Sequence, residues 1–250
     1  MTNISIEICV LLYAFQKRFW WMLSSLAQQK NLIPHLIIKI NTYKDDPYKD
    51  LTVKLIKTFD KLLDLKVKEY DCENFGYRTY TRNFDVLEAT SDWLLFTDAD
   101  IVFHPDFFNR LLPSMEDVRN TNKIISVSRY TMEFENALKL VDSLLYENST
   151  IENSYNICHD TYPVTWSVCS VPIGAGFFQL VKTATVQQTT YVENFHVDRS
   201  LFSKKGNKFW GDKVFRNKTP GSLFKLRNIP APIHISHLRH KQKGWTNICR

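Results

Sequence analysis

The sequence is poor in residues that interrupt regular structure, and it lacks long apolar runs. Only 7 glycines and 9 prolines occur in 250 residues, and no low-complexity tract or internal repeat is visible. No stretch approaches the roughly 18 apolar residues that cross a membrane. No basic segment precedes the apolar N-terminus, as a secretion signal would require. We therefore expect one compact domain with no transmembrane segment.

Cysteines are few and do not form a pattern. Their number is odd, and none stands at the short spacing of a metal-binding knuckle. Such scattered thiols are typical of reduced proteins, which predicts a cytoplasmic location. The five are Cys9, Cys72, Cys158, Cys169 and Cys249.

Acidic residues are nearly absent from the C-terminal fifth of the chain. Residues 199–250 hold thirteen Lys and Arg residues but one acid, Asp212. This segment therefore has a net charge of +12, whereas the whole chain has a net charge of +6. A segment of this charge favours an anionic partner. Nucleotide phosphates, a polyanionic acceptor, DNA or a membrane surface in peripheral contact all fit.

The rest of the composition describes a globular protein, with 44% hydrophobic and 23% charged residues. Apolar, partly β-branched segments alternate with segments of helical periodicity. This alternation predicts an α/β fold with a mostly parallel sheet. The expected strands are 4–13, 35–41, 67–70 and 93–97, and the expected helices are 17–29, 51–62 and 84–89, with Leu62 and Leu87 facing inward.

The stretch from Trp93 to Pro105 carries the strongest chemical signal. An apolar run, Trp-Leu-Leu-Phe-Thr, leads directly to Asp98 and Asp100. Carboxylates at the C-terminal edge of a parallel strand lie where open α/β sheets bind ligands. Two aspartates one residue apart can share one divalent cation, although Asp is also common in turns.

Other polar side chains are expected near the same edge. Tyr13, Ala14 and Asn41 follow the first two predicted strands, and Tyr13 is a candidate to stack on a base. Arg82 lies near the start of the helix before the central strand, where a cation suits a diphosphate. An ion pair of Arg82 with Asp85 or Glu88 is the alternative.

Four segments in this order resemble the glycosyltransferases of the GT-A fold, family-2 type, that use nucleotide-diphosphate sugars. They are Arg82-Asn83 followed by Trp93–Ile101, the Gly-rich Val171–Leu180, Phe209-Trp210-Gly211-Asp212 and the His-rich 234–240. The resemblance spans nearly the whole chain. It implies a Rossmann-like, mostly parallel central sheet flanked by helices, with a nucleotide-sugar half at 1–104 and an acceptor half at 105–250.

The resemblance also implies roles for residues. Tyr13, Ala14 and Arg18 correspond to the opening nucleotide loop, and Asn41, Arg82, Asp98 and Ala99 would complete the donor site. Asp98 and Asp100 would hold Mn²⁺ or Mg²⁺, with His237 preferred over His234 and His240 as the nitrogen ligand. UDP is the expected nucleotide, and a surface saccharide or glycolipid is the expected acceptor.

Asp212 matches the acidic catalytic segment of these enzymes. In an inverting transfer one carboxylate accepts the proton of the acceptor hydroxyl, and Asp212 is the candidate. Lys243 of the basic segment would close over the diphosphate. The sequence departs from the family where Lys213 replaces a second acid and where Asn41 replaces a nucleoside-binding aspartate.

Three alternatives compete with this interpretation. A nucleotidyltransferase also uses two aspartates and a metal, but no glycine follows the first predicted strand. A non-catalytic nucleic-acid-binding protein would use the basic segment alone. A phage-type glycosyltransferase acting on hydroxymethylated bases of DNA would combine both features, and a phage-encoded chain would act in the host cytoplasm.

Overall fold

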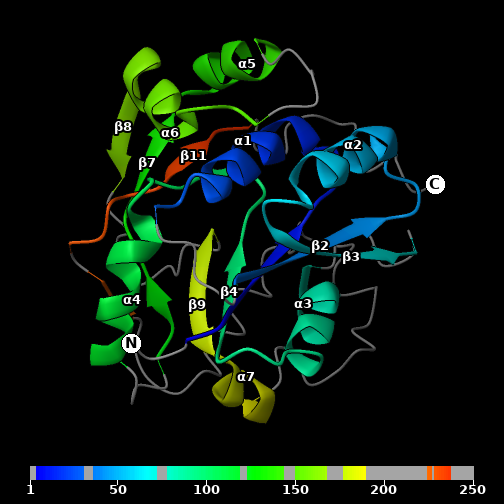
Figure 1. Ribbon diagram of the computed structural model, residues 1–250, viewed down its shortest axis with the longest axis vertical. Coiled ribbons are helices and arrows are strands. Elements are labelled where there is room, and N and C mark those ends of the chain that lie inside the picture. Colours follow the sequence, from blue (N-terminus) through cyan, green and yellow to red (C-terminus); the bar gives the residue numbers. More distant parts are fainter. Residues whose placement is uncertain are drawn as a thin grey trace, which may run out of the picture.

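The computed structural model describes residues 4–30, 36–71, 78–118, 123–143, 150–167, 177–189, 224–226 and 228–237. They form a central seven-stranded sheet with helices on both faces and a smaller four-stranded sheet beside it (Figure 1). The expected α/β fold with a mostly parallel central sheet is confirmed.

The central sheet has the strand order β10-β6-β9-β4-β1-β2-β3. Neighbours β4, β1, β2 and β3 are parallel, and only β9 runs antiparallel, between β6 and β4. The strand bounds are β1 Ile6–Leu11, β2 Leu36–Tyr43, β3 Asp64–Tyr70, β4 Trp93–Thr97, β6 Ile125–Ser126, β9 Phe178–Lys182 and β10 Phe224–Lys225. The parallel arrangement brings the C-terminal ends of β1, β2 and β4 to one edge.

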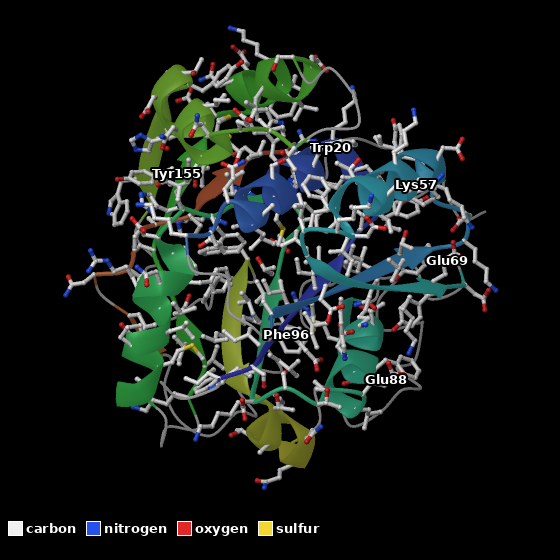
Figure 2. The ribbon with its side chains drawn as sticks, in the orientation of Figure 1. Trp20, Lys57, Glu69, Glu88, Phe96 and Tyr155 are labelled. Carbon is white, nitrogen blue, oxygen red and sulfur yellow. The ribbon has the colours of Figure 1, made fainter. Side chains whose placement is uncertain are left out.

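Alternating side chains of the central strands enter two separate hydrophobic clusters. In β4, Leu95 joins the larger cluster with Trp20 of α1, whereas Leu94 and Phe96 join a smaller one with Val86 of α3. Figure 2 labels Trp20 and Phe96, which come from these two layers. A strand buried on both faces needs apolar residues at every position, which explains the unbroken apolar run before Asp98.

Helices cover both faces of this sheet. The bounds are α1 Gln16–Ala27, α2 Lys49–Phe59, α3 Arg78–Leu87, α4 Phe107–Asp117, α5 Phe134–Asp142, α6 Ser154–Asn156, the π-helix η2 Ile157–Thr161 and α7 Thr183–Thr189. Helices α1, α2 and α4 supply the larger cluster, and α3 and α7 supply the smaller one. The inward positions expected for Leu62 and Leu87 are wrong: α2 ends before Leu62, and both side chains are about half exposed.

A second sheet, which the strand pattern did not predict, has the order β5-β11-β7-β8. Its strands are β5 Ile101–Val102, β7 Arg129–Met132, β8 Val164–Ser167 and β11 Ile233–Ile235. Strand β11 lies between β5, which is antiparallel to it, and β7, which is parallel. Two residues, His234 and Thr131, therefore sit side by side although about 100 positions separate them in the chain.

None of the helices in the described part of the chain is long and apolar enough to cross a membrane.

Candidate active site

The two sheets meet where β4 ends and β5 begins, and Asp98, Ala99 and Asp100 form this junction. Asp98 is partly exposed, whereas Ala99 and Asp100 are buried. The backbone carbonyl of Asp100 accepts a hydrogen bond from Ile235 N at 2.9 Å, which ties the junction to β11. The Asp-x-Asp segment thus lies at the predicted sheet edge and faces the second sheet.

Two histidines from β11 and the residues after it surround the Asp100 carboxylate. His234 Nε2 lies 3.3 Å and His237 Nε2 lies 3.9 Å from Asp100 Oδ2. Both histidines therefore contact the second aspartate, and the one that the sequence did not favour, His234, is the nearer. The signal for both was their place in the late His-rich segment.

Arg18 of α1 adds a cation to this group. Its Nη2 donates to the carbonyl of Ser236 at 3.3 Å, and its guanidinium lies 5.4 Å from the ring centre of Phe15. The ring of Phe15 also packs edge-on against His237, with ring centres 4.9 Å apart. Phe15 thereby holds both the cation and the imidazole beside Asp100.

The electrostatics keep Asp100 ionised. Burial alone would raise its pKa, but His234, His237 and Arg18 together hold the pKa below the ordinary value. Burial lowers the pKa of His237, an effect that Asp100 offsets in part. A buried carboxylate beside a neutral imidazole offers an anionic oxygen and a nitrogen lone pair in one place.

These donors suit a divalent cation. Asp100 Oδ1 is buried and has no hydrogen-bond partner in the structure, so an oxygen of the carboxylate is open to a ligand. Carboxylate oxygen with imidazole nitrogen is a common donor set for Mn²⁺. In the described ranges no three His, Cys, Asp or Glu side chains already stand in a metal-binding arrangement. Asp100 and a neighbouring imidazole thus supply part of a metal site, and the remaining ligands of a bound ion would come from other groups, such as a diphosphate or water.

The loop after β1 contains a residue with an unusual backbone conformation and is tied to the end of β2. Ala14 adopts a left-handed backbone conformation, with φ 57°. Its N–H points at Asp46 Oδ2, at 3.4 Å, and Gln16 Nε2 donates to the same oxygen at 2.6 Å. Asp46 follows β2 and is buried, and sequence reasoning missed it because Asn41 was taken as the end of the strand.

Tyr13 belongs to the wall of this region. Its ring packs edge-on against Tyr43, with centres 5.9 Å apart, and it is 4% exposed. Tyr43 in turn contacts Tyr70 at 6.4 Å. Burial, with Asp45 and Asp46 nearby, raises the pKa of Tyr13 to about 12, so its hydroxyl stays protonated.

Asn41 and Arg82 lie in a buried polar layer between the sheet and α3. Asn41 Nδ2 donates to Asp85 Oδ2 at 2.8 Å. Arg82 Nη1 lies 3.5 Å from Gln179 Oε1, with its guanidinium 5.2 Å from the ring centre of Phe96. The structure places Arg82 on the α3 face, whereas the contacts of Asp100 come from α1 and the second sheet.

Several predicted site segments lie outside the described residues. These are Asp212, Lys243, His240 and the Gly-rich residues 171–176.

Comparisons with known proteins agree with this geometry. The model of the family "Glycosyl transferase family 2" matches residues 8–169. Two solved structures similar in fold are Staphylococcus aureus TarS residues 1–349 with UDP-GlcNAc and the mannosyltransferase PcManGT from Pyrobaculum calidifontis with GDP-Man and Mn²⁺. For TarS, identity is 14%, coverage is 94% of this chain and 62% of that chain, and the TM-score is 0.60. For PcManGT, identity is 14%, coverage is 94% of this chain and 58% of that chain, and the TM-score is 0.59.

The chain thus spans about 60% of the length of these two proteins. A comparison with curated protein sequences gives no match. The family match covers well over half of the chain and includes the Asp98–Asp100 junction. The chain therefore belongs to glycosyl transferase family 2, the glycosyltransferases of the GT-A fold.

Proposed function

We propose that this protein transfers a sugar from a nucleotide-diphosphate donor, a UDP-sugar, to a hydroxyl group of a surface saccharide or glycolipid. The observation that supports this most is the buried Asp100 carboxylate, held between His234, His237 and Arg18 at the C-terminal sheet edge. A diphosphate leaving group carries negative charge that such a site neutralises. The two similar structures bind UDP-GlcNAc and GDP-Man.

In this proposal the donor lies across the ends of β1, β2 and β4, within residues 1–104. The nucleoside contacts the loop of Tyr13 and Ala14 and the end of β2, where Asn41 and Asp46 lie. Arg18 and Arg82 supply the cations for the diphosphate, and Arg18 acts electrostatically on Asp100. Asp98 and Ala99 line the nucleotide side of the junction.

Mn²⁺ or Mg²⁺ would be held by Asp98, Asp100 and His237, with His234 as a further nitrogen donor. When bound, such an ion polarises the diphosphate as a Lewis acid. The side chains of the protein orient the diphosphate and exclude water. Arg18 and the basic segment orient the phosphates, and Lys243 closes over them and excludes water.

Asp212 is the proposed base of an inverting reaction. It would accept the proton of the acceptor hydroxyl as the oxygen attacks the anomeric carbon, and the nucleoside diphosphate leaves with the bonding electrons. The acceptor is bound by residues 105–250. The basic segment 199–250 supports hydroxymethylated DNA as a second candidate acceptor. We place the reaction in the cytoplasm.

Calorimetric titration of UDP, UDP-sugars and GDP-sugars, with Mn²⁺ and with EDTA, tests the proposal. The wild type should bind a UDP-sugar only with the metal present. Asp100→Ala should weaken this binding at least tenfold, because it removes the carboxylate at the centre of the site. Asp212→Asn should retain donor binding and lose transfer by orders of magnitude.

The control is Asp60→Asn, a change at an exposed carboxylate after α2. It should alter neither binding nor transfer. An unchanged metal requirement in Asp100→Ala would remove Asp100 as a ligand. Absence of any nucleotide binding, together with salt-dependent DNA binding, would favour the nucleic-acid-binding alternative.

A further inference from the structure

The second sheet presents two unlike faces. On one face, Tyr130 and Met132 of β7 pack with Ile233 and Ile235 of β11 in a hydrophobic cluster. Because side chains alternate along a strand, His234 and its register partner Thr131 occupy the opposite face. Thr165 of β8, paired with Thr131, lies on that face too. On β7 and β8 the face that holds His234 is therefore polar, whereas on β5 it carries Ile101, the register partner of His234, which is buried in the larger hydrophobic cluster.

Arg129 is on this polar face, two residues before Thr131. Its guanidinium carbon lies 4.4 Å from the ring centre of Phe177, which fixes the cation against an aromatic face. The carbonyl of Phe177 accepts a hydrogen bond from Thr97 Oγ1 at 2.7 Å, and Thr97 directly precedes Asp98. Arg129 is thus anchored next to the junction, from the side of the second sheet.

Arg129 and Arg18 lie on opposite sides of His234. Tyr130 N donates to the carbonyl of Pro232, which places Arg129 at the start of β11. Arg18 contacts Ser236, beyond the end of β11. Four residues separate these two points, which is no more than about 14 Å. Arg18 follows the nucleotide loop in α1 and so belongs to the donor side. Arg129 is on the other side of His234, away from the nucleotide loop.

We propose that the polar face of β7 and β8 binds the acceptor and that Arg129 selects an acceptor with an anionic group, a phosphate or a carboxylate, near its reactive hydroxyl. Thr131 and Thr165 offer hydroxyl groups to the sugar part. A guanidinium fixed in place loses little freedom when it binds an oxyanion, so it discriminates between charged and neutral acceptors. This inference rests on the proposed function where it identifies the bound anion as part of an acceptor. The binding of an anion to Arg129 does not depend on that function.

The test uses glycerol 3-phosphate and glucuronate as anionic probes, with glycerol and glucose as their neutral counterparts. Binding is followed by saturation-transfer NMR on the full chain, with and without UDP and Mn²⁺. Both anions should bind at least tenfold more tightly than the neutral probes. Their binding should persist when UDP fills the donor site. A preference between the two anions distinguishes a phosphate from a carboxylate acceptor.

Arg129→Gln should remove the preference for anions, and Arg129→Lys should keep part of it. Arg110→Gln, at an exposed arginine of α4, is the matched control and should behave as the wild type. Circular dichroism verifies that each variant is folded. Equal binding of neutral and anionic probes, displacement of the anion by UDP, or a preference retained in folded Arg129→Gln would overturn the inference.

Loss of UDP binding and loss of anion binding are separate results. Anion binding at Arg129 without any UDP binding would refute the proposed transfer function and leave the anion site standing. UDP binding without the anion preference would refute the anion site and leave the proposed transfer function standing.

Discussion

Asp85 is a carboxyl group that the fold removes almost completely from water. Burial raises its pKa to about 7, although Asn41, Lys39 and Arg82 act in the opposite direction. Between pH 4 and 7 the folded state therefore holds a proton that the unfolded state has lost, so stability falls as the pH rises through this range. Asp85 therefore makes the free energy of unfolding depend on pH in this range, which an exposed aspartate does not.

We predict that Asp85→Asn removes this pH dependence. Asparagine is neutral at every pH, and its Oδ1 can still accept the hydrogen bond from Asn41. Relative to the wild type, the free energy of unfolding of the variant should rise by up to about 4 kcal/mol between pH 4 and pH 8. Urea unfolding at several pH values measures this difference. A difference that does not change with pH would contradict the assignment, and Asp60→Asn is the control.

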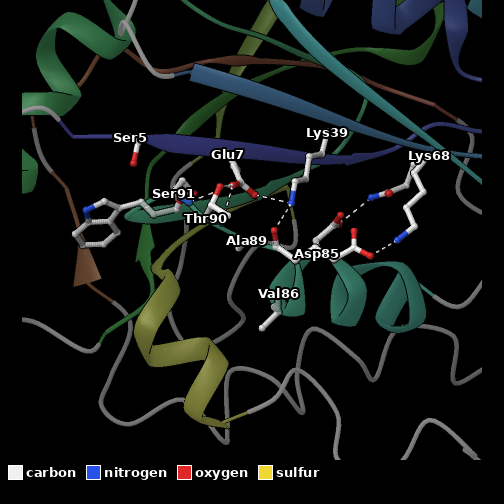
Figure 3. Close-up of polar contacts among 12 residues, drawn as sticks. Ser5, Glu7, Lys39, Lys68, Asp85, Val86, Ala89, Thr90 and Ser91 are labelled. Carbon is white, nitrogen blue, oxygen red and sulfur yellow. Dashed lines mark hydrogen bonds and ion pairs between the residues drawn. The ribbon is translucent and has the colours of Figure 1, made fainter.

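At the scale of elements, Glu7 joins three parts of the chain. Its carboxylate in β1 lies 2.7 Å from Lys39 Nζ in β2. It also accepts hydrogen bonds from the backbone N–H groups of Thr90 and Ser91, at 2.9 and 3.1 Å, in the turn between α3 and β4 (Figure 3). Burial would raise its pKa, but Lys39, Thr90 and Ser91 lower it overall. This contribution to stability is therefore present above the unfolded pKa and is lost as the pH falls through the lower, folded pKa.

Glu7→Gln should lower the free energy of unfolding by about 3 kcal/mol at pH 7, because it leaves the charge of Lys39 without its buried partner. Glu69→Gln, which breaks the exposed pair with Lys49, should cost less than about 1 kcal/mol. Adding Lys39→Met to Glu7→Gln should restore part of the loss. Urea denaturation of the three variants and the wild type measures these values. Equal losses in both single Glu→Gln variants would show that the buried pair has no special role.

At the scale of the whole molecule, the chain joins the two sheets at Asp98–Asp100, between β4 and β5, and again between β6 and β7. The proposed donor binds at the first of these junctions. A ligand that binds only the folded state at 100 times its Kd adds about 2.7 kcal/mol of stability. For a chain of this size we expect UDP with Mn²⁺ to raise Tm by about 5–10 °C. Scanning calorimetry measures the shift. EDTA should abolish the shift, and Asp100→Ala, with binding weakened at least tenfold, should reduce it by about half or more. A full shift in that variant would place the ligand elsewhere.

Much of the fold could be predicted from sequence because the information is local. The apolar run before Asp98 needs no knowledge of its neighbours, because a short unbroken run of this kind that ends in turn residues is typical of a strand buried on both faces. The parallel direction of β1, β2 and β3 follows in the same way from the alternation of strands and helices along the chain. Leu62 and Leu87 were misplaced because helix ends, unlike helix existence, depend on contacts outside the helix.

The candidate site, like the fold, has a part that the sequence predicted and a part that it did not. The sequence by itself determined that two aspartates end a buried strand and that histidines and cations occur late in the chain. Only the tertiary structure decided that His234 contacts Asp100 more closely than His237, that Asp46 supports the loop of Ala14, and that Arg129 reaches the junction. The physical reason is strand register. The pairing of β11 with β5 and β7 joins residues about 100 or more positions apart, and a shift of one residue would turn His234 to the apolar face.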